Sequence, residues 1–188
     1  SKGSAIGYEL RGSGVPVLLA HGLLGDGSFW DEVASQLEED FLLIICDLRG
    51  HRHSQVDAPF TLWDVADDLV AILDAEGIED APFVGFSMGG MASMRCTLRY
   101  PSRVKALSLI STAAGGEKLM TKRRNFLMAS IVQRTGPLRI FEPMVKDLMF
   151  TREFRRRHPS AVEDTLESSR RHGGRSIAHA VRAVFGRD

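Results

Sequence analysis

The sequence has few cysteines, no surplus of either charge and no long apolar run. Lys+Arg and Asp+Glu are equal at 24 each, so the charge balance does not favour nucleic acid, an anionic membrane or a strongly charged substrate. The longest apolar runs, Val15 to Ala20 and Phe41 to Cys46, are far shorter than the roughly 20 residues that cross a bilayer. We therefore expect no nucleic-acid partner and no membrane partner.

The two cysteines, Cys46 and Cys96, fall in an apolar strand pattern and in a helical pattern. These positions suit buried reduced thiols better than a disulfide, and we expect a cytoplasmic protein. The His, Cys and carboxylate spacings match no zinc pattern, so no metal site is expected. The turn from Gly85 to Gly90 lacks the Lys of a phosphate-binding loop, and no cofactor is expected.

Up to about Thr112, short apolar runs alternate with longer amphipathic stretches, as in an α/β fold. The apolar runs are almost continuous, which indicates a sheet covered on both faces and mostly parallel. The pattern predicts a three-layer α/β sandwich with a core at residues 1–112. The expected strands are Ala5–Arg11, Val15–His21, Phe41–Asp47, Ala81–Phe86 and Val104–Ile110, and the expected helices are Ser28–Glu39, Thr61–Gly77 and Ser87–Tyr100.

Residues 113–188 have a different character, being basic, rich in Met and Phe and helix-prone. We interpret them as a helical cap. Breaks at Gly136-Pro137, His158-Pro159 and Gly173-Gly174 predict about four short helices.

The strongest functional motif is Gly85-Phe86-Ser87-Met88-Gly89, where an apolar strand runs into a helix. Gly-x-Ser-x-Gly in that context predicts a nucleophile elbow, in which a strained turn presents the Ser87 hydroxyl at a helix N-terminus. Gly85 and Gly89 leave out side chains that would clash at so sharp a bend. The alternative is a glycine-rich turn with no chemistry.

A second motif, His21-Gly22-Leu23-Leu24-Gly25, directly follows the strand that begins at Val15. This is where such a fold builds an oxyanion hole, and we expect its two N–H groups to come from Leu23 and Met88. His21 is interpreted as a buried residue that holds its own loop, with Gly22, in support of the site; a proton-transfer role is the alternative.

A third motif, Asp47-Leu48-Arg49-Gly50-His51-Arg52-His53-Ser54, follows the next strand. With the elbow, it makes the chain resemble the α/β-hydrolase superfamily, which commonly shows Asp-x-Arg-Gly-His-Gly-x-Ser here. Arg52 stands where that pattern has a second Gly, a departure that concerns the local turn and the access route above the site. The chain is also similar in sequence to 3-oxoadipate enol-lactonases and related carboxylic-ester hydrolases. The similarity extends over nearly the whole chain and includes the segments Phe83 to Gly90, Tyr100 to Val104 and Ser111 to Ala114.

The resemblance implies a triad of Ser, then an acid, then His, with both partners after the cap. This sequence reaches Asp188 while still cap-like, so we expect the acid and the His to lie outside this chain, in a fold truncated after the cap. His158, His172 and His179 lie in basic helical segments and are not expected to replace the catalytic His. An early stop would leave Val104–Ile110 as an open apolar edge, and we expect either that this chain is one piece of a longer polypeptide or that a second chain or a second copy covers the edge.

The leading hypothesis is hydrolysis of a small carboxylic ester or lactone through an acyl-enzyme on Ser87. One alternative is a small-molecule receptor or signalling module on the same fold, and another is an inactive fragment that needs a complementing chain. Apolar cap residues would line an acyl pocket or simply form core: Leu127, Met128, Met144, Met149 and Phe150. The basic stretches Lys122 to Arg124 and Arg152 to His158 are interpreted as solvated helix faces, or else as a preference for a carboxylate-bearing substrate.

Overall fold

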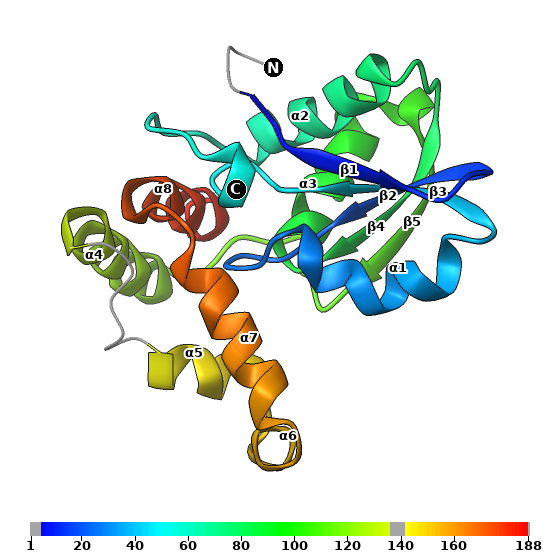
Figure 1. Ribbon diagram of the computed structural model, residues 1–188. Coiled ribbons are helices and arrows are strands. Elements are labelled where there is room, and N and C mark those ends of the chain that lie inside the picture. Colours follow the sequence, from blue (N-terminus) through cyan, green and yellow to red (C-terminus); the bar gives the residue numbers. More distant parts are fainter. Residues whose placement is uncertain (1–4, 136–141, 188) are drawn as a thin grey trace.

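The computed structural model describes residues 5–135 and 142–187, and its centre is one five-stranded sheet (Figure 1). The strand order is β1-β3-β2-β4-β5. Strand β1 pairs with β3 antiparallel, and the other pairings are parallel. The predicted α/β class with a mostly parallel sheet is therefore confirmed. The strands are β1 Tyr8–Arg11, β2 Val15–Ala20, β3 Phe41–Cys46, β4 Ala81–Phe86 and β5 Val104–Ile110.

Helices cover both faces of the sheet. Successive strand residues point to opposite sides, and both sides carry apolar side chains that the helices bury. Leu18, Ala20 and Ile44 are buried in a cluster with the apolar side chains of α2 (Leu62–Ala75) and α3 (Met88–Arg99). Their neighbours Leu19, Leu43 and Ile45 form a second cluster on the opposite face, with Trp30 and Ala34. Ala34 belongs to α1 (Asp31–Leu37), which lies on that side (Figure 1).

The helix predicted at 28–39 is divided into a 3-10 turn, Gly27–Trp30, and α1. The reason is a cap that lies earlier than expected, because the Asp26 carboxylate accepts a hydrogen bond from Ser28 N at 2.9 Å. Helix α2 has the predicted start: Thr61 and Asp64 form a reciprocal capping box. It ends before Gly77, whose φ of +66° needs a residue without a Cβ.

The edge of the sheet at β5 is more open than its centre. Strand β5 pairs only with β4 in the described sheet, and Leu109 and Ile110 are exposed. The central residues Leu18, Ile44 and Phe83 are fully buried. The folded core therefore lies around β2, β3 and β4.

The predicted cap is helical, with five helices in its described part. The breaks at His158-Pro159 and Gly173-Gly174 are present, whereas Gly136-Pro137 lies outside the described residues. The additional break comes at Thr151, whose hydroxyl accepts from Phe154 N at 3.1 Å and starts a new helix. The helices are α4 Leu119–Thr135, α5 Glu142–Met149, α6 Arg152–Arg157, α7 Pro159–Arg170 and α8 Gly174–Phe185.

Helix α8 joins the cap to the core. Its residues Ile177, Ala180 and Val184 belong to the same buried cluster as the β2 and β3 side chains. The division at residues 112 and 113 stays a prediction. None of the described helices has the length and apolarity needed to span a membrane.

Candidate active site

Ser87 lies at the tip of the turn between β4 and α3. Its φ of +48° and ψ of −109° place a residue with a side chain in a region that normally favours glycine, and such strain is typical of functional turns. Two residues at the end of β5 or just after it hold the turn: Ser87 N donates to Ile110 O at 2.9 Å, and Thr112 Oγ1 donates to Ser87 O at 2.7 Å. The sharp bend predicted from the motif is present.

The glycines beside Ser87 are fixed by close backbone contacts. A Cβ at Gly89 would lie 2.2 Å from the Ala20 carbonyl oxygen, and one at Gly85 would lie 2.5 Å from Gly90 N. Both distances are far inside van der Waals contact. Helix α3 can therefore begin this close to β2 and β4 only with glycine at these two positions.

The turn after β2 packs directly on the elbow. Gly89 N donates to the His21 carbonyl oxygen at 3.0 Å, and a Cβ at Gly22 would lie 3.3 Å from the Ser87 Cβ. Among the described residues, neither Leu23 N nor Met88 N donates a hydrogen bond to the protein. Met88 is the first residue of α3, where the helix dipole favours negative charge. The predicted residues of the hole and the elbow are thus brought together, and the roles assigned to them stay predictions.

Behind this turn lies a buried histidine cluster, His21, His51 and His172. His21 Nδ1 donates to Gly22 O at 2.7 Å, and its Nε2 accepts from Leu48 N at 2.9 Å, so both ring nitrogens are bonded to backbone. The ring planes of His21 and His51 meet edge to face, with centroids 5.0 Å apart, and His51 meets His172 in the same way. The three rings form one continuous support.

The other two rings of the histidine cluster hold Leu24. His51 Nε2 accepts from Leu24 N at 3.2 Å. His172 Nε2 donates to Leu24 O at 3.1 Å, while its Nδ1 accepts from Arg52 N at 3.1 Å. Leu24 itself has a φ of +69°, so these bonds stabilise a strained residue beside the predicted oxyanion hole.

Burial keeps the histidine cluster neutral. It lowers the pKa of His21 to about 4. It also lowers the pKa of His51 and of His172, because the charged imidazolium loses hydration. With their nitrogens engaged by the backbone, these rings position the loop and are poorly placed to take a proton from Ser87.

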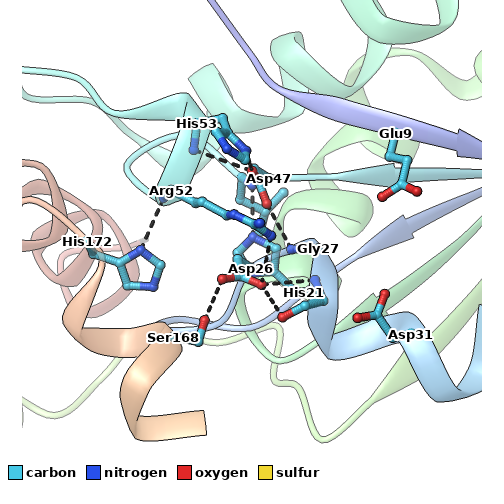
Figure 2. Close-up of polar contacts among 12 residues, drawn as sticks. Glu9, His21, Asp26, Gly27, Asp31, Asp47, Arg52, His53, Ser168 and His172 are labelled. Carbon is cyan, nitrogen blue, oxygen red and sulfur yellow. Dashed lines mark hydrogen bonds and ion pairs between the residues drawn. The ribbon is translucent and has the colours of Figure 1, made fainter. Parts of the chain in front are cut away.

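A second polar contact joins the cap to the core at Asp26 (Figure 2). This buried carboxylate accepts from the Ser28 and Ser168 hydroxyls and lies 3.6 Å from a guanidinium nitrogen of Arg52. Although burial raises its pKa, the hydrogen bonds from Ser168 and Ser28 hold the pKa of Asp26 down at about 2. Arg52, which replaces the second Gly of the family pattern, has a φ of +35° and reaches from its turn toward Asp26.

Below the turn, Arg49 and Asp68 form a buried bidentate ion pair, with Arg49 Nε at 2.6 Å and Nη2 at 2.5 Å from the carboxylate. The hydrogen bonds that Arg49 donates to the Asp68 carboxylate hold the pKa of Arg49 above its ordinary value. The pair ties the turn after β3 to α2.

The sequence motifs do not reveal every residue that supports this site. His172 and Ser168 reach Leu24, Arg52 and Asp26 from cap positions more than a hundred residues away. Their sequence surroundings are basic and helical, with no motif that singles them out. Glu117, two residues before α4 begins at Leu119, likewise pairs with the distant Arg187 at 2.9 Å.

An apolar cavity of about 150 Å³ lies between the cap helices and the turn after β2. Its wall includes Leu23 and Leu24 from the turn, together with Met128 and Met144 from the cap. Of the other apolar cap residues considered from the sequence, Leu127 is exposed, and Met149 and Phe150 do not line this cavity. Ser87 is not part of the wall, but Leu23 follows Gly22, which packs on Ser87.

Comparison with known proteins finds relatives that are hydrolases by name. The chain is 31% identical over 144 residues to a putative carbamate hydrolase RutD of Azorhizobium caulinodans, covering 72% of this chain and 54% of that protein. It is 25% identical over 185 residues to 3-oxoadipate enol-lactonase 1 of Acinetobacter baylyi, covering 97% of this chain and 68% of that protein. The chain thus spans about half to two thirds of the length of these relatives.

Among solved structures, a thermophilic esterase from Thermogutta terrifontis, solved with malate bound, matches with a TM-score of 0.92 at 27% identity. The match covers 97% of this chain and 67% of that one. A family model described as the alpha/beta hydrolase fold matches residues 15–136, which contain the elbow, the turn after β2 and the turn after β3. The chain belongs to the α/β hydrolase fold family.

Proposed function

We propose that the whole protein is a serine hydrolase that cleaves a small carboxylic ester or lactone through an acyl-enzyme on Ser87. In this mechanism the Ser87 Oγ attacks the carbonyl carbon, and its proton passes to a base. The negative oxygen that forms is held by Leu23 N–H and Met88 N–H, and the bond to the leaving oxygen then breaks as the base returns the proton to it, which releases the alcohol portion. Water hydrolyses the acyl-enzyme and regenerates the hydroxyl.

The observation that carries this proposal is the strained Ser87 beside two N–H groups that have no hydrogen-bond partner among the described residues. The φ of +48° sets the hydroxyl at the N-terminus of α3. Donors that need no reorganisation contribute about 3 kcal/mol each to lowering such a barrier. The curated relatives and the solved esterase are hydrolases by name, which supports the same reaction class.

We further propose that the triad acid and His are supplied from outside these 188 residues. Among the described residues, none hydrogen-bonds the Ser87 Oγ. The rings of the histidine cluster are held by backbone groups instead. Both observations support a base that comes from another segment.

A fluorophosphonate probe tests the nucleophile directly in the full-length protein. We expect one covalent adduct, mapped by mass spectrometry to Ser87 and lost in Ser87→Ala. Ser93→Ala is the matched control, because Ser93 lies in the same helix and its hydroxyl donates to Gly89 O at 2.8 Å. A folded protein that gives no adduct, or an adduct elsewhere, would contradict the proposal.

The open edge at β5 leads to a proposal about partners. Leu109 and Ile110 are 43% and 41% exposed on an edge strand, and unpaired apolar edges tend to recruit another strand. We propose that a second chain or a second copy covers this edge. Light scattering should give a mass above that of one chain, reduced to the monomer in Leu109→Lys; a monomeric wild-type chain would refute the proposal.

A further inference from the structure

We infer that the cavity beside Leu23 binds the apolar part of an uncharged ester or lactone and that Asn125 recognises one oxygen on it. This inference rests on the function proposed above and defines its substrate class. Three observations support it: the size and lining of the cavity, an amide nitrogen in its wall that has no hydrogen-bond partner among the described residues, and the charge around its polar rim.

The size of the cavity limits what can enter. A volume of about 150 Å³ corresponds to a benzene-sized group, so the buried part of the ligand has about six non-hydrogen atoms. Most of the wall is apolar. Its apolar residues come from three cap helices: Met128 and Val132 from α4, Val145 from α5, and Ile177 and Phe185 from α8. A short ring or branched chain fits this space best.

Asn125 is a polar residue of the wall whose amide nitrogen is available to a ligand. Its side chain is 7% exposed, and its Nδ2 has no hydrogen-bond partner in the described structure. A buried donor without a partner costs about 1–3 kcal/mol. A ligand with a carbonyl or ring oxygen in the cavity removes that cost, whereas a hydrocarbon of the same shape does not.

The charges at the rim argue against an anionic ligand. Arg170, a charged residue of the wall, has Nε 2.9 Å from Glu142, and its Nη1 lies 2.8 Å from Glu163 and 3.2 Å from Glu167. One guanidinium thus faces three carboxylates, and a substrate carboxylate would add a fourth. The basic cap stretches considered from the sequence, Lys122 to Arg124 and Arg152 to His158, do not line this cavity.

The preference for neutral substrates separates this chain from the lactonase that it resembles. An enol-lactone of a dicarboxylic acid keeps one free carboxylate, and the rim around Arg170 opposes that group. The chemistry of the cavity therefore favours a neutral lactone or short ester.

The test uses three probes of similar shape that cannot be hydrolysed: cyclohexanone, methylcyclohexane and cyclohexanecarboxylate. Binding to the ¹⁵N-labelled full chain is followed by NMR, including the side-chain NH₂ signal of Asn125. We expect cyclohexanone to bind about tenfold more tightly than either other probe and to shift that signal, since tenfold corresponds to about one hydrogen bond.

Variants make each part of the inference falsifiable. Asn125→Leu should remove the preference for the ketone over the hydrocarbon, and Met128→Leu, which keeps an apolar wall, should retain it. Glu163→Gln with Glu167→Gln should raise the affinity for the carboxylate about tenfold by leaving Arg170 with one partner. An unchanged preference in Asn125→Leu, or wild-type binding of the carboxylate as tightly as the ketone, would overturn the inference.

The binding test of the cavity is independent of the labelling test of Ser87. Binding of these probes does not need Ser87, so Ser87→Ala should give the wild-type pattern. Probe labelling of Ser87 with no ketone preference would refute the cavity assignment alone. A ketone preference that depends on Asn125, in a protein whose Ser87 takes no fluorophosphonate, would leave the cavity assignment standing and refute the hydrolase.

Discussion

The polar groups behind the turn at residues 21–25 are hydrogen-bonded, whereas several of those in front of it have no partner among the described residues. Behind the turn, both ring nitrogens of His21 and of His172 are hydrogen-bonded to backbone groups. In front of it, Leu23 N, Met88 N and Asn125 Nδ2 have no partner among the described residues. Paired polar groups contribute to stability, whereas buried unpaired ones cost free energy until a ligand meets them.

Within this one loop, the groups that hold the structure are therefore distinct from the groups that we propose take part in the reaction. The backbone N–H groups of the adjacent residues Leu23 and Leu24 differ: Leu24 N donates to His51 Nε2, whereas Leu23 N has no acceptor among the described residues. Changes behind the turn should therefore lower the free energy of unfolding, and changes in front should lower turnover with the fold intact. Variants on each side of the turn test this division.

The largest effect is expected from removing one N–H at a time. Replacing Leu23 by its α-hydroxy acid turns that amide into an ester and removes the donor with little change of shape. Turnover of a short ester by the full-length protein should fall about 10²–10³-fold, with the unfolding midpoint in urea almost unchanged. The same replacement at Leu24 removes the donor to His51 and should lower the free energy of unfolding by about 1–2 kcal/mol, with a much smaller loss of turnover. Equal losses of turnover at both positions would break the comparison.

His21→Leu should have the next largest effect, on stability. The substitution leaves Gly22 O and Leu48 N buried without partners, at a cost of about 2–4 kcal/mol in the free energy of unfolding. Urea denaturation at pH 7 measures it. His158→Leu is the control, since that ring is exposed and its loss should change stability by no more than about 0.5 kcal/mol. Equal stability of the two variants would remove the supporting role of His21.

The histidine cluster also predicts a pH dependence. His21 has a folded pKa of about 4, below its ordinary value of 6.5, so the unfolded chain binds more protons between these limits. Stability should therefore be full above pH 6.5 and fall as the pH drops toward 4, by about 3 kcal/mol from His21 alone. His51 and His172 shift in the same direction.

His172→Gln sharpens this prediction, because an amide can still donate to Leu24 O and accept from Arg52 N without titrating. Urea unfolding across pH 4 to 7 should show a shallower slope in this variant than in the wild type. A wild-type stability that stays flat over this range would mean that the rings are hydrated or already charged.

The sequence predicts the parts of this site that lie within short motifs. The bend at Ser87, the turn after His21 and the capping box at Thr61 each depend on neighbours a few residues apart. All five strands are at the predicted places. Strand β1 begins at Tyr8 and not at Ala5, because its first pair is with Cys46, while Gly7 N and O already bond to Ser54 and Asp47.

The sequence could not predict the contacts that join the cap to the core. Ser168 reaches Asp26 and His172 reaches Leu24 across 142 and 148 residues, and no local pattern encodes such pairings. Asn125 is equally hidden, since a single polar residue in a helical stretch is usually solvated. Its burial depends on how α4 packs on α8, which is a property of the assembled fold.

The smallest effect is expected at Thr112, on the supported side of the elbow. Its hydroxyl donates to Ser87 O at 2.7 Å, but that oxygen also accepts from Met91 N at 3.0 Å. Thr112→Val should therefore cost only about 1 kcal/mol of stability, while slowing fluorophosphonate labelling of Ser87 a few-fold, because the strained turn loses one of its fixed points. Thr97→Val is the matched control: Thr97 Oγ1 donates to Ser93 O at 3.1 Å in the same helix, away from the elbow. It should cost similar stability without slowing the labelling. If both variants label at the wild-type rate, the backbone alone holds Ser87 in place, and support and chemistry are more sharply separated than the hydrogen bonds suggest.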